Sequence, residues 1–162
     1  MHISPILRLM LLLTMANGAP VVAKKIFGSR FAVALDFGAT FFDGRPVFGS
    51  SKTIRGIVAA ILATTACAPL IGLDPTIGAI AAGTAMAGDL FSSFVKRRLK
   101  LPPSSQALGL DQIPESLLPL LACRDALSLT AADIAIGVGI FFAGELVLSR
   151  LLFRVHLRDE PY

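Results

Sequence analysis

The chain has 162 residues, of which 54% are hydrophobic and 16% are charged, and its formal net charge is +4. Soluble domains seldom exceed about 50% apolar residues, and their apolar runs are short. Several runs in this chain approach the roughly 20 residues that a helix needs to cross a bilayer. We therefore expect an all-α integral membrane protein with a single domain, 1–162. Cys67 and Cys123 fall within apolar runs, which predicts two buried free thiols and argues against a metal pair or a disulfide.

Five apolar segments follow one another, and we expect them to form a bundle of five transmembrane helices. They span about 4–23, 54–73, 75–95, 113–127 and 131–155. The first is expected to be retained, because "MANGAP" offers no small-x-small cleavage site. The third is rich in glycine and alanine, which lets helix backbones approach closely in lipid, so it is predicted to be central. The fourth is the shortest, because Arg124 and Asp125 interrupt it.

Cations gather in alternate connections between these segments. The loops of about 27–53 and about 96–112 contain clusters of lysine and arginine, whereas the connection between the second and third segments contains only Asp74. Short loops rich in lysine and arginine stay in the cytoplasm. This predicts two cytoplasmic loops, an N-terminus outside, a cytoplasmic C-terminus, and a place in the plasma membrane.

The stretch "GDLFSSFVKRRLK" places a carboxylate within the third segment and a block of cations after it. Ionisable residues at membrane depth are costly and often functional. Ser93 and Lys96 follow Asp89 by four and seven positions, so all three share one helix face. Two interpretations are open. Asp89 belongs to a catalytic site, or it is neutralised by cations that act only as an orientation signal.

Two further stretches place charge on the same predicted side. "LDFGATFFDGRPVFGSSKTIRG" combines Asp36 and Asp43 with glycines and cations, and glycine-rich backbone can approach phosphate closely. "GLDQIPE" places Asp111 and Glu115 before the fourth segment. Taken alone, these stretches are also compatible with a solvated loop and with helix capping.

Together the three stretches point to a polyphosphate and Mg²⁺. Carboxylates are hard ligands that suit Mg²⁺, and the neighbouring lysines and arginines suit phosphates. The sequence contains no Walker-type loop, no Cys/His zinc spacing and no Ser-His-Asp arrangement. Basic residues expected at a membrane surface, without interleaved aromatic residues, argue against a nucleic-acid partner.

The motifs resemble those of a known family. "GDLFSSFVKRR" followed by "LDQ" is similar to the signature of the membrane cytidylyltransferases that make CDP-lipids. "DFGATFFDGRPVFGSSKTIRG" and "NGAP" resemble the smaller branch formed by CDP-archaeol synthase and its bacterial relatives. The resemblance implies transfer of a cytidylyl group from CTP to a lipid phosphate at the bilayer, with Mg²⁺ and release of pyrophosphate.

The resemblance also implies roles for individual residues. Its catalytic residues are Asp89, Lys96 and Asp111. The residues near CTP and the lipid phosphate are Asp43, Lys52, Arg55, Ser93, Arg97, Arg98 and Gln112. Asp89 and Asp111 are the implied metal ligands, with Asp36, Asp43 and Glu115 as further candidates. The broader signature has a second acid at the position of Pro114, next to Glu115.

Two other classes of function stay open at this stage. A small transporter or lipid-binding protein would use Asp89 and Glu145, which lies within the fifth segment, to line a polar path. A structural membrane subunit would use neither. The sequence leaves open the chain type of the lipid phosphate and whether the protein forms a homodimer.

Overall fold

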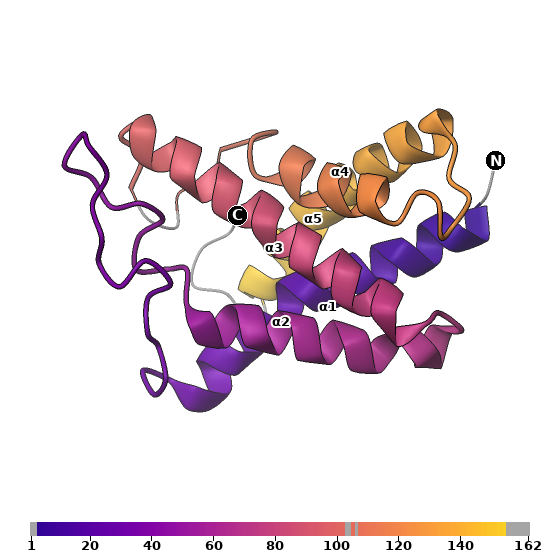
Figure 1. The fold of residues 1–162 in the computed structure, drawn as a ribbon, viewed down its shortest axis with the longest axis horizontal. Helices are drawn as coiled ribbons and strands as arrows, with labels where there is room; N and C mark the ends of the chain where they lie inside the picture. The colour runs from indigo at the N-terminus through magenta and orange to yellow at the C-terminus, as the bar shows by residue number, and fades with distance from the viewer. Residues whose placement is uncertain (1–2, 103–104, 106, 155–162) are drawn as a thin grey trace.

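The computed structural model describes residues 3–102, 105 and 107–154. Its α-helices are α1 (Ile3–Phe27), α2 (Ile54–Cys67), α3 (Pro75–Arg98), α4 (Gln112–Ala122) and α5 (Ala131–Arg154), and a short 3₁₀ helix, η1 (Ala68–Ile71), follows α2 (Figure 1). No strand forms in this part of the chain, where two isolated β-bridges lie in the loop between α1 and α2. The prediction of an all-α protein is confirmed.

Helix α3 lies at the centre of the bundle, as its small residues predicted. It packs against α1, α2 and α4, and α4 also packs against α5. Ala81, Ala82 and Ala85 of α3 are fully buried, together with long side chains of α1 such as Leu9 and Leu13. Small residues on the inner helix therefore make room for leucines on its neighbour.

Two glycines of α3 allow especially close helix contacts. A Cβ atom at Gly78 would lie 2.7 Å from the backbone oxygen of Thr64 in α2. A Cβ at Gly88 would collide with the carbonyl of Pro114 and lie 2.7 Å from the Cα of Glu115 in α4. Real Cβ atoms do not approach backbone this closely, so both crossings require glycine.

Four helices are long and apolar enough to cross a membrane: Ser4–Phe27, Ile54–Ile71, Pro75–Arg98 and Ala131–Leu151. The fourth predicted segment, 113–127, is shorter than expected. Helix α4 has 11 residues, or about 16 Å at 1.5 Å per residue, about half of a 30 Å hydrocarbon core. The helix ends at Ala122, and turns follow from Cys123 to Ser128. Arg124 and Asp125 lie exposed in those turns.

The other boundaries differ from the predictions by less. Helix α1 continues to Phe27 and α3 to Arg98, whereas the second segment changes from α-helix to 3₁₀ helix at Ala68, next to Pro69. Helix α5 is described to Arg154, and Val155 lies outside the described residues. Cys67 and Cys123 are both free, as expected; Cys123 is buried, whereas Cys67 is only partly buried, so the prediction of two buried thiols is correct for Cys123 alone.

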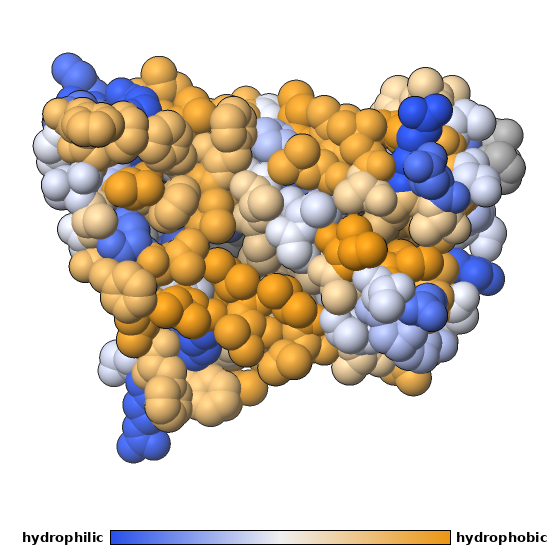
Figure 2. Space-filling model, viewed as in Figure 1, coloured by the Kyte–Doolittle hydropathy of each residue, from blue (hydrophilic) through white to orange (hydrophobic). Residues whose placement is uncertain are grey.

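The loop between α1 and α2 is folded at one end of the bundle, beside the C-terminal end of α3 (Figure 1). Antiparallel bridges join Ala34 to Thr53 and Thr40 to Pro46. Figure 2 shows hydrophobic side chains over the middle of one face of the molecule and most hydrophilic ones toward its ends. This distribution is typical of a protein whose middle contacts lipid chains.

Candidate active site

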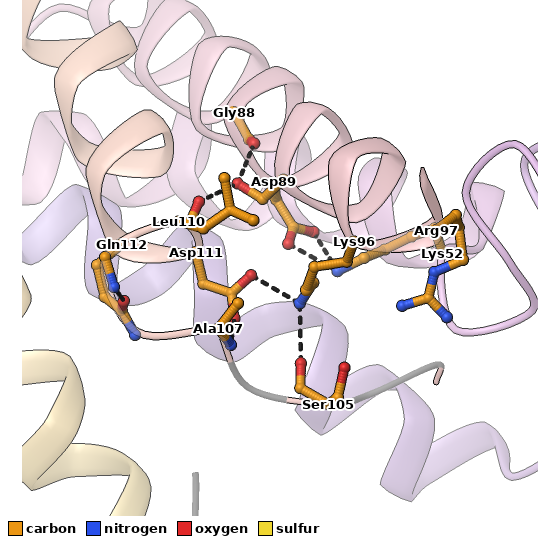
Figure 3. A network of polar contacts seen from close by, with 12 residues as sticks. Lys52, Gly88, Asp89, Lys96, Arg97, Ser105, Ala107, Leu110, Asp111 and Gln112 are labelled. Carbon is orange, nitrogen blue, oxygen red and sulfur yellow. Dashed lines mark hydrogen bonds and ion pairs between the residues drawn. The ribbon is translucent and has the colours of Figure 1, made fainter. Parts of the chain in front are cut away.

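The first half of the site is an ion pair between the α1–α2 loop and α3. The Nζ atom of Lys52 lies 2.6 Å from each carboxylate oxygen of Asp89 (Figure 3). Lys52 directly precedes Thr53, whose side chain caps α2 by accepting a hydrogen bond from the Gly56 amide. The start of α2 thus fixes the direction from which Lys52 reaches α3, and Asp89 is not an isolated carboxylate at membrane depth.

The second half is an ion pair between α3 and the segment before α4. The Nζ atom of Lys96 lies 2.6 Å from Oδ1 of Asp111 and donates to the backbone oxygen of Ser105 at 3.0 Å. Asp111 also accepts a hydrogen bond from the Ala107 amide at 2.9 Å. Asp89 and Lys96 project from the same side of α3, as their spacing predicted, but each pairs with a residue from another segment (Figure 3).

The two pairs form one electrostatic unit. Besides Asp89, Lys52 interacts with the charges of Glu115 and Asp111. Burial disfavours the charge of Lys52, but the charge and hydrogen bond of Asp89, together with the charges of Glu115 and Asp111, outweigh burial and raise the pKa of Lys52 above its ordinary value. Glu115 is 7% exposed and also lies within electrostatic range of Asp89 and Glu145. Three predicted acids therefore surround one lysine.

Arg97 adds an incompletely paired cation. Its side chain is only 5% exposed, and Nη2 donates to the backbone oxygen of Pro102 at 2.9 Å. Its Nε and Nη1 atoms have no hydrogen-bond partner among the described residues. A buried donor without a partner costs free energy, so a guanidinium in this state favours an anionic ligand.

Two side chains close to the pairs shape the backbone. The Oγ atom of Ser92 lies 2.9 Å from the Gly88 oxygen and 2.5 Å from the Leu110 oxygen, and so connects α3 to the segment before α4. Gln112 is buried and accepts a hydrogen bond from the Gly109 amide at 2.9 Å. Sequence reasoning chose Ser93, which is buried, and missed Ser92, whose partner becomes evident only when α3 and α4 are placed together.

Arg98 and Asp43 hold the α1–α2 loop against α3. The Arg98 guanidinium lies 4.8 Å from the ring centres of both Phe41 and Phe94. Its Nη1 atom is 3.2 Å from Oδ1 of Asp43, and Nη2 donates to the oxygen of Pro46. In this conformation Arg98 and Asp43, both predicted to bind substrate, hold the α1–α2 loop against α3.

Arg55 and Asp36 likewise organise the loop. Arg55 donates hydrogen bonds to the backbone oxygens of Gly28 and Arg30. The carboxylate of Asp36 accepts hydrogen bonds from three loop amides, those of Gly38, Phe48 and Gly49. Burial opposes the charge of Asp36, but these amides outweigh it and hold the pKa below its ordinary value.

The donor set suits a metal that arrives with a polyphosphate. Among the residues that the structure describes, no three His, Cys, Asp or Glu side chains lie close enough to hold an ion by themselves. Mg²⁺ is commonly bound by one or two carboxylates, with the remaining positions filled by phosphate and water. Asp89 and Asp111 fit this mode, and each carboxylate is paired with a lysine in this structure.

Comparisons with known proteins identify the family of the chain. The CarS-like, CDP-archaeol synthase family model matches residues 3–74. A CDP-archaeol synthase of Pyrobaculum islandicum is 32% identical over 156 residues, which cover 91% of each chain. The chain belongs to the CDP-archaeol synthase family. The resemblance inferred from the sequence motifs is thus confirmed.

A solved structure supports the same family assignment. It is described as an intramembrane enzyme for archaeal membrane lipids biosynthesis, and it matches with a TM-score of 0.75 and 31% identity over 87% of this chain and 90% of that chain. The CDP-archaeol synthase of Pyrococcus furiosus is 39% identical over 107 residues, and that of Pyrobaculum calidifontis is 37% identical over 115. These two alignments span 60% and 66% of the relatives' own lengths, which is less than two thirds.

Proposed function

We propose that this protein transfers the cytidylyl group of CTP to a lipid phosphate, giving a CDP-lipid and pyrophosphate. Family membership supports the reaction class, because the relatives are named CDP-archaeol synthase. The observation that carries the proposal is that α3 offers an acid and a cation, Asp89 and Lys96, and that each is held 2.6 Å from a partner of opposite charge. Such a site can exchange its internal ion pairs for contacts with phosphates.

Exchange of partners is the central step expected of these residues. The phosphates of CTP compete with Asp89 for Lys52 and with Asp111 for Lys96, and Arg97 offers two nitrogens that have no partner among the described residues. Asp89 and Asp111, released from their lysines, would hold Mg²⁺, which supplies positive charge to phosphates that would otherwise repel each other. Glu115 lies within electrostatic range of both carboxylates and is a positioning candidate.

The reaction itself needs little proton transfer. An oxygen of the lipid phosphate attacks the α-phosphorus of CTP, the bond from that phosphorus to the bridging oxygen breaks, and pyrophosphate leaves with the electron pair. Because the nucleophile is already an anion, the site needs no strong general base. Fixed cations such as Lys96 and Arg97 stabilise the charge that develops on the leaving group. Lys52, once released from Asp89, would contact the phosphates of CTP from the other side of the site.

We also propose the topology of the chain in the plasma membrane. The N-terminus lies outside and the C-terminus in the cytoplasm, and the loops of about 27–53 and 96–112 face the cytoplasm with the site. Helix α4 alone is too short to cross the membrane, so the crossing between α3 and α5 needs α4 together with the turns that follow it, as far as Ser128. A cysteine introduced at Ser128 should react with a membrane-impermeant thiol reagent from outside. Reaction only from the cytoplasmic side would contradict this topology.

The activity is tested with purified protein, labelled CTP and Mg²⁺. Lipid phosphates with ether-linked isoprenoid chains and with ester-linked acyl chains are offered side by side, and CDP-lipid is separated from CTP. We expect CDP-lipid from the ether-linked substrate, in keeping with the name of the relatives, and turnover of the ester-linked one would extend the substrate class. Solute flux through the protein without CTP turnover would favour the transporter alternative.

Asp89→Asn is the matching variant, because asparagine has nearly the same shape but no charge. We expect it to lose CDP-lipid formation while it stays folded at the assay temperature and elutes from a sizing column like the parent. Full activity in this variant would contradict the proposed role of the Lys52–Asp89 pair.

A further inference from the structure

The loop between α1 and α2 exposes aromatic side chains. Phe31 is 73% exposed, Phe37 is 78% exposed and Phe42 is fully exposed, and Phe27 and Phe41 are also exposed. Scattered single apolar residues are common on protein surfaces, but a gathering of large ones marks an interaction surface. The loop thus needs a partner that accepts phenylalanine rings.

The exposure is a property of a folded loop. Phe31 and Phe37 have φ angles of +58° and +48°, in the left-handed region that bulky residues rarely adopt. Three amides bound to the Asp36 carboxylate fix the loop around Phe37. The Phe41 ring contacts the Arg98 guanidinium, and its centre lies 5.0 Å from that of Phe42 and 5.2 Å from that of Phe94 in α3. The rings are therefore held outward by the surrounding structure.

Charge and position identify the partner as a lipid headgroup layer. Lys24, Lys25 and Arg30 are exposed next to these rings, and no acidic residue occurs in positions 1–35. The candidate span Ser4–Phe27 has 24 residues, or about 36 Å, which exceeds the roughly 30 Å hydrocarbon core. Its last turn therefore emerges at the two lysines. Aromatic rings beside cations at this depth are typical of the membrane interface.

Figure 2 agrees with this position, because hydrophobic side chains lie beside hydrophilic ones at the end of the molecule where the loop lies. We propose that residues 24–42, the interfacial segment, lie in the headgroup layer of an anionic leaflet. The phenylalanines insert between lipids, and Lys24, Lys25 and Arg30 contact negatively charged headgroups. This inference goes beyond the proposed function and does not depend on it.

The interfacial segment also connects to the candidate site. The Leu35 amide donates to the backbone oxygen of Lys52 at 2.8 Å, and the Ile54 amide donates to the Val33 oxygen at 3.0 Å. Insertion of the interfacial segment would therefore hold Lys52 close to the depth at which lipid phosphates lie. A lipid headgroup could then reach the site without leaving the membrane.

The chain contains no tryptophan, so a single introduced one reports its own surroundings. Phe42→Trp is reconstituted into vesicles of phosphatidylglycerol and phosphatidylcholine, with lipids brominated near the headgroup end of the acyl chain. We expect a shift of the emission to shorter wavelength, quenching by the bromolipid, and protection from aqueous iodide. Leu62→Trp, at an exposed position of the α2 span, is the control that should report the hydrocarbon core.

The opposite quenching result would overturn the proposal. If Phe42→Trp is quenched by iodide and not by bromolipid, while the Leu62→Trp control behaves as expected, the rings face water or await a protein partner, and the proposal is overturned. Phe31→Trp repeats the measurement at the other end of the interfacial segment, in case the first variant does not fold.

A charge variant tests the preference for anionic lipid. Lys24→Gln, Lys25→Gln and Arg30→Gln are combined in the Phe42→Trp background. In the Phe42→Trp protein, bromolipid quenching should be stronger in vesicles that contain phosphatidylglycerol than in vesicles of phosphatidylcholine alone. The triple charge variant of this protein should lose the difference. Equal quenching of the parent in both vesicles would refute the role of the three cations.

Discussion

Substitution of Gly88 tests the contact that joins the two halves of the site. Alanine at Gly88 would force its methyl group into the carbonyl of Pro114 and to within 2.7 Å of the Glu115 Cα atom. Both obstacles are backbone atoms, so no side chain can rotate away, and the start of α4 has to move from α3. Gly83, on the same helix, has no neighbouring atom within 4 Å of the place that a Cβ would take, and it serves as the matched control.

The expected magnitude follows from two opposing terms. Overpacking of a tight contact costs about 1–3 kcal/mol. Replacement of glycine by alanine within a helix returns up to about 1 kcal/mol. Gly88→Ala should therefore lose about 0–3 kcal/mol of unfolding free energy and Gly83→Ala should gain up to about 1 kcal/mol. The difference between the two variants isolates the cost of the collision.

Unfolding is followed by circular dichroism in detergent micelles, and CDP-lipid formation is measured alongside. Displacement of α4 would disturb the Ser92–Leu110 hydrogen bond and the Lys96–Asp111 pair, so we expect Gly88→Ala to lose activity even at temperatures where it stays folded. If Gly88→Ala is as stable and as active as Gly83→Ala, the close α3–α4 crossing is wrong.

Three further predictions follow from the charged groups. Lys52→Met and Asp89→Asn should each destabilise the protein more than the double variant does, because each single change leaves a largely buried charge without its partner. Additive losses of unfolding free energy in the double variant would contradict this prediction. Because the pKa of Asp36 is lowered in the folded protein, its stabilisation of the loop is present above pH ~4 and is lost as the pH falls through the folded-state pKa. Hydrogen-exchange protection of the Phe48 and Gly49 amides should therefore fall on acidification. The variant Asp36→Asn should remove this pH dependence. Arg98→Ala should lose about 1–2 kcal/mol of local stability, because it removes the stacking of the guanidinium on two rings. Limited proteolysis should therefore cut the α1–α2 loop faster in Arg98→Ala than in Lys100→Ala, a control at an exposed position. Equal rates would show that the stacking does not hold the loop.

Much of the architecture is a local property of the sequence. Long apolar runs determine membrane helices, because the bilayer leaves backbone groups no partner except one another. The helical repeat determines that Asp89 and Lys96 share a face of α3, wherever that face points. The motifs around these residues were also sufficient to indicate the family, since they are short and contiguous in the chain.

Tertiary structure decided which charges meet. Asp89 pairs with Lys52, 37 positions away, and Lys96 pairs with Asp111. The sequence alone left open that the cations which follow Asp89 neutralise it. Arg55, predicted to bind phosphate, donates to the backbone oxygens of two loop residues in this structure. Spacing along a helix specifies the direction of a side chain, but the atom that it meets depends on how the helices pack and on the path of the loop between them.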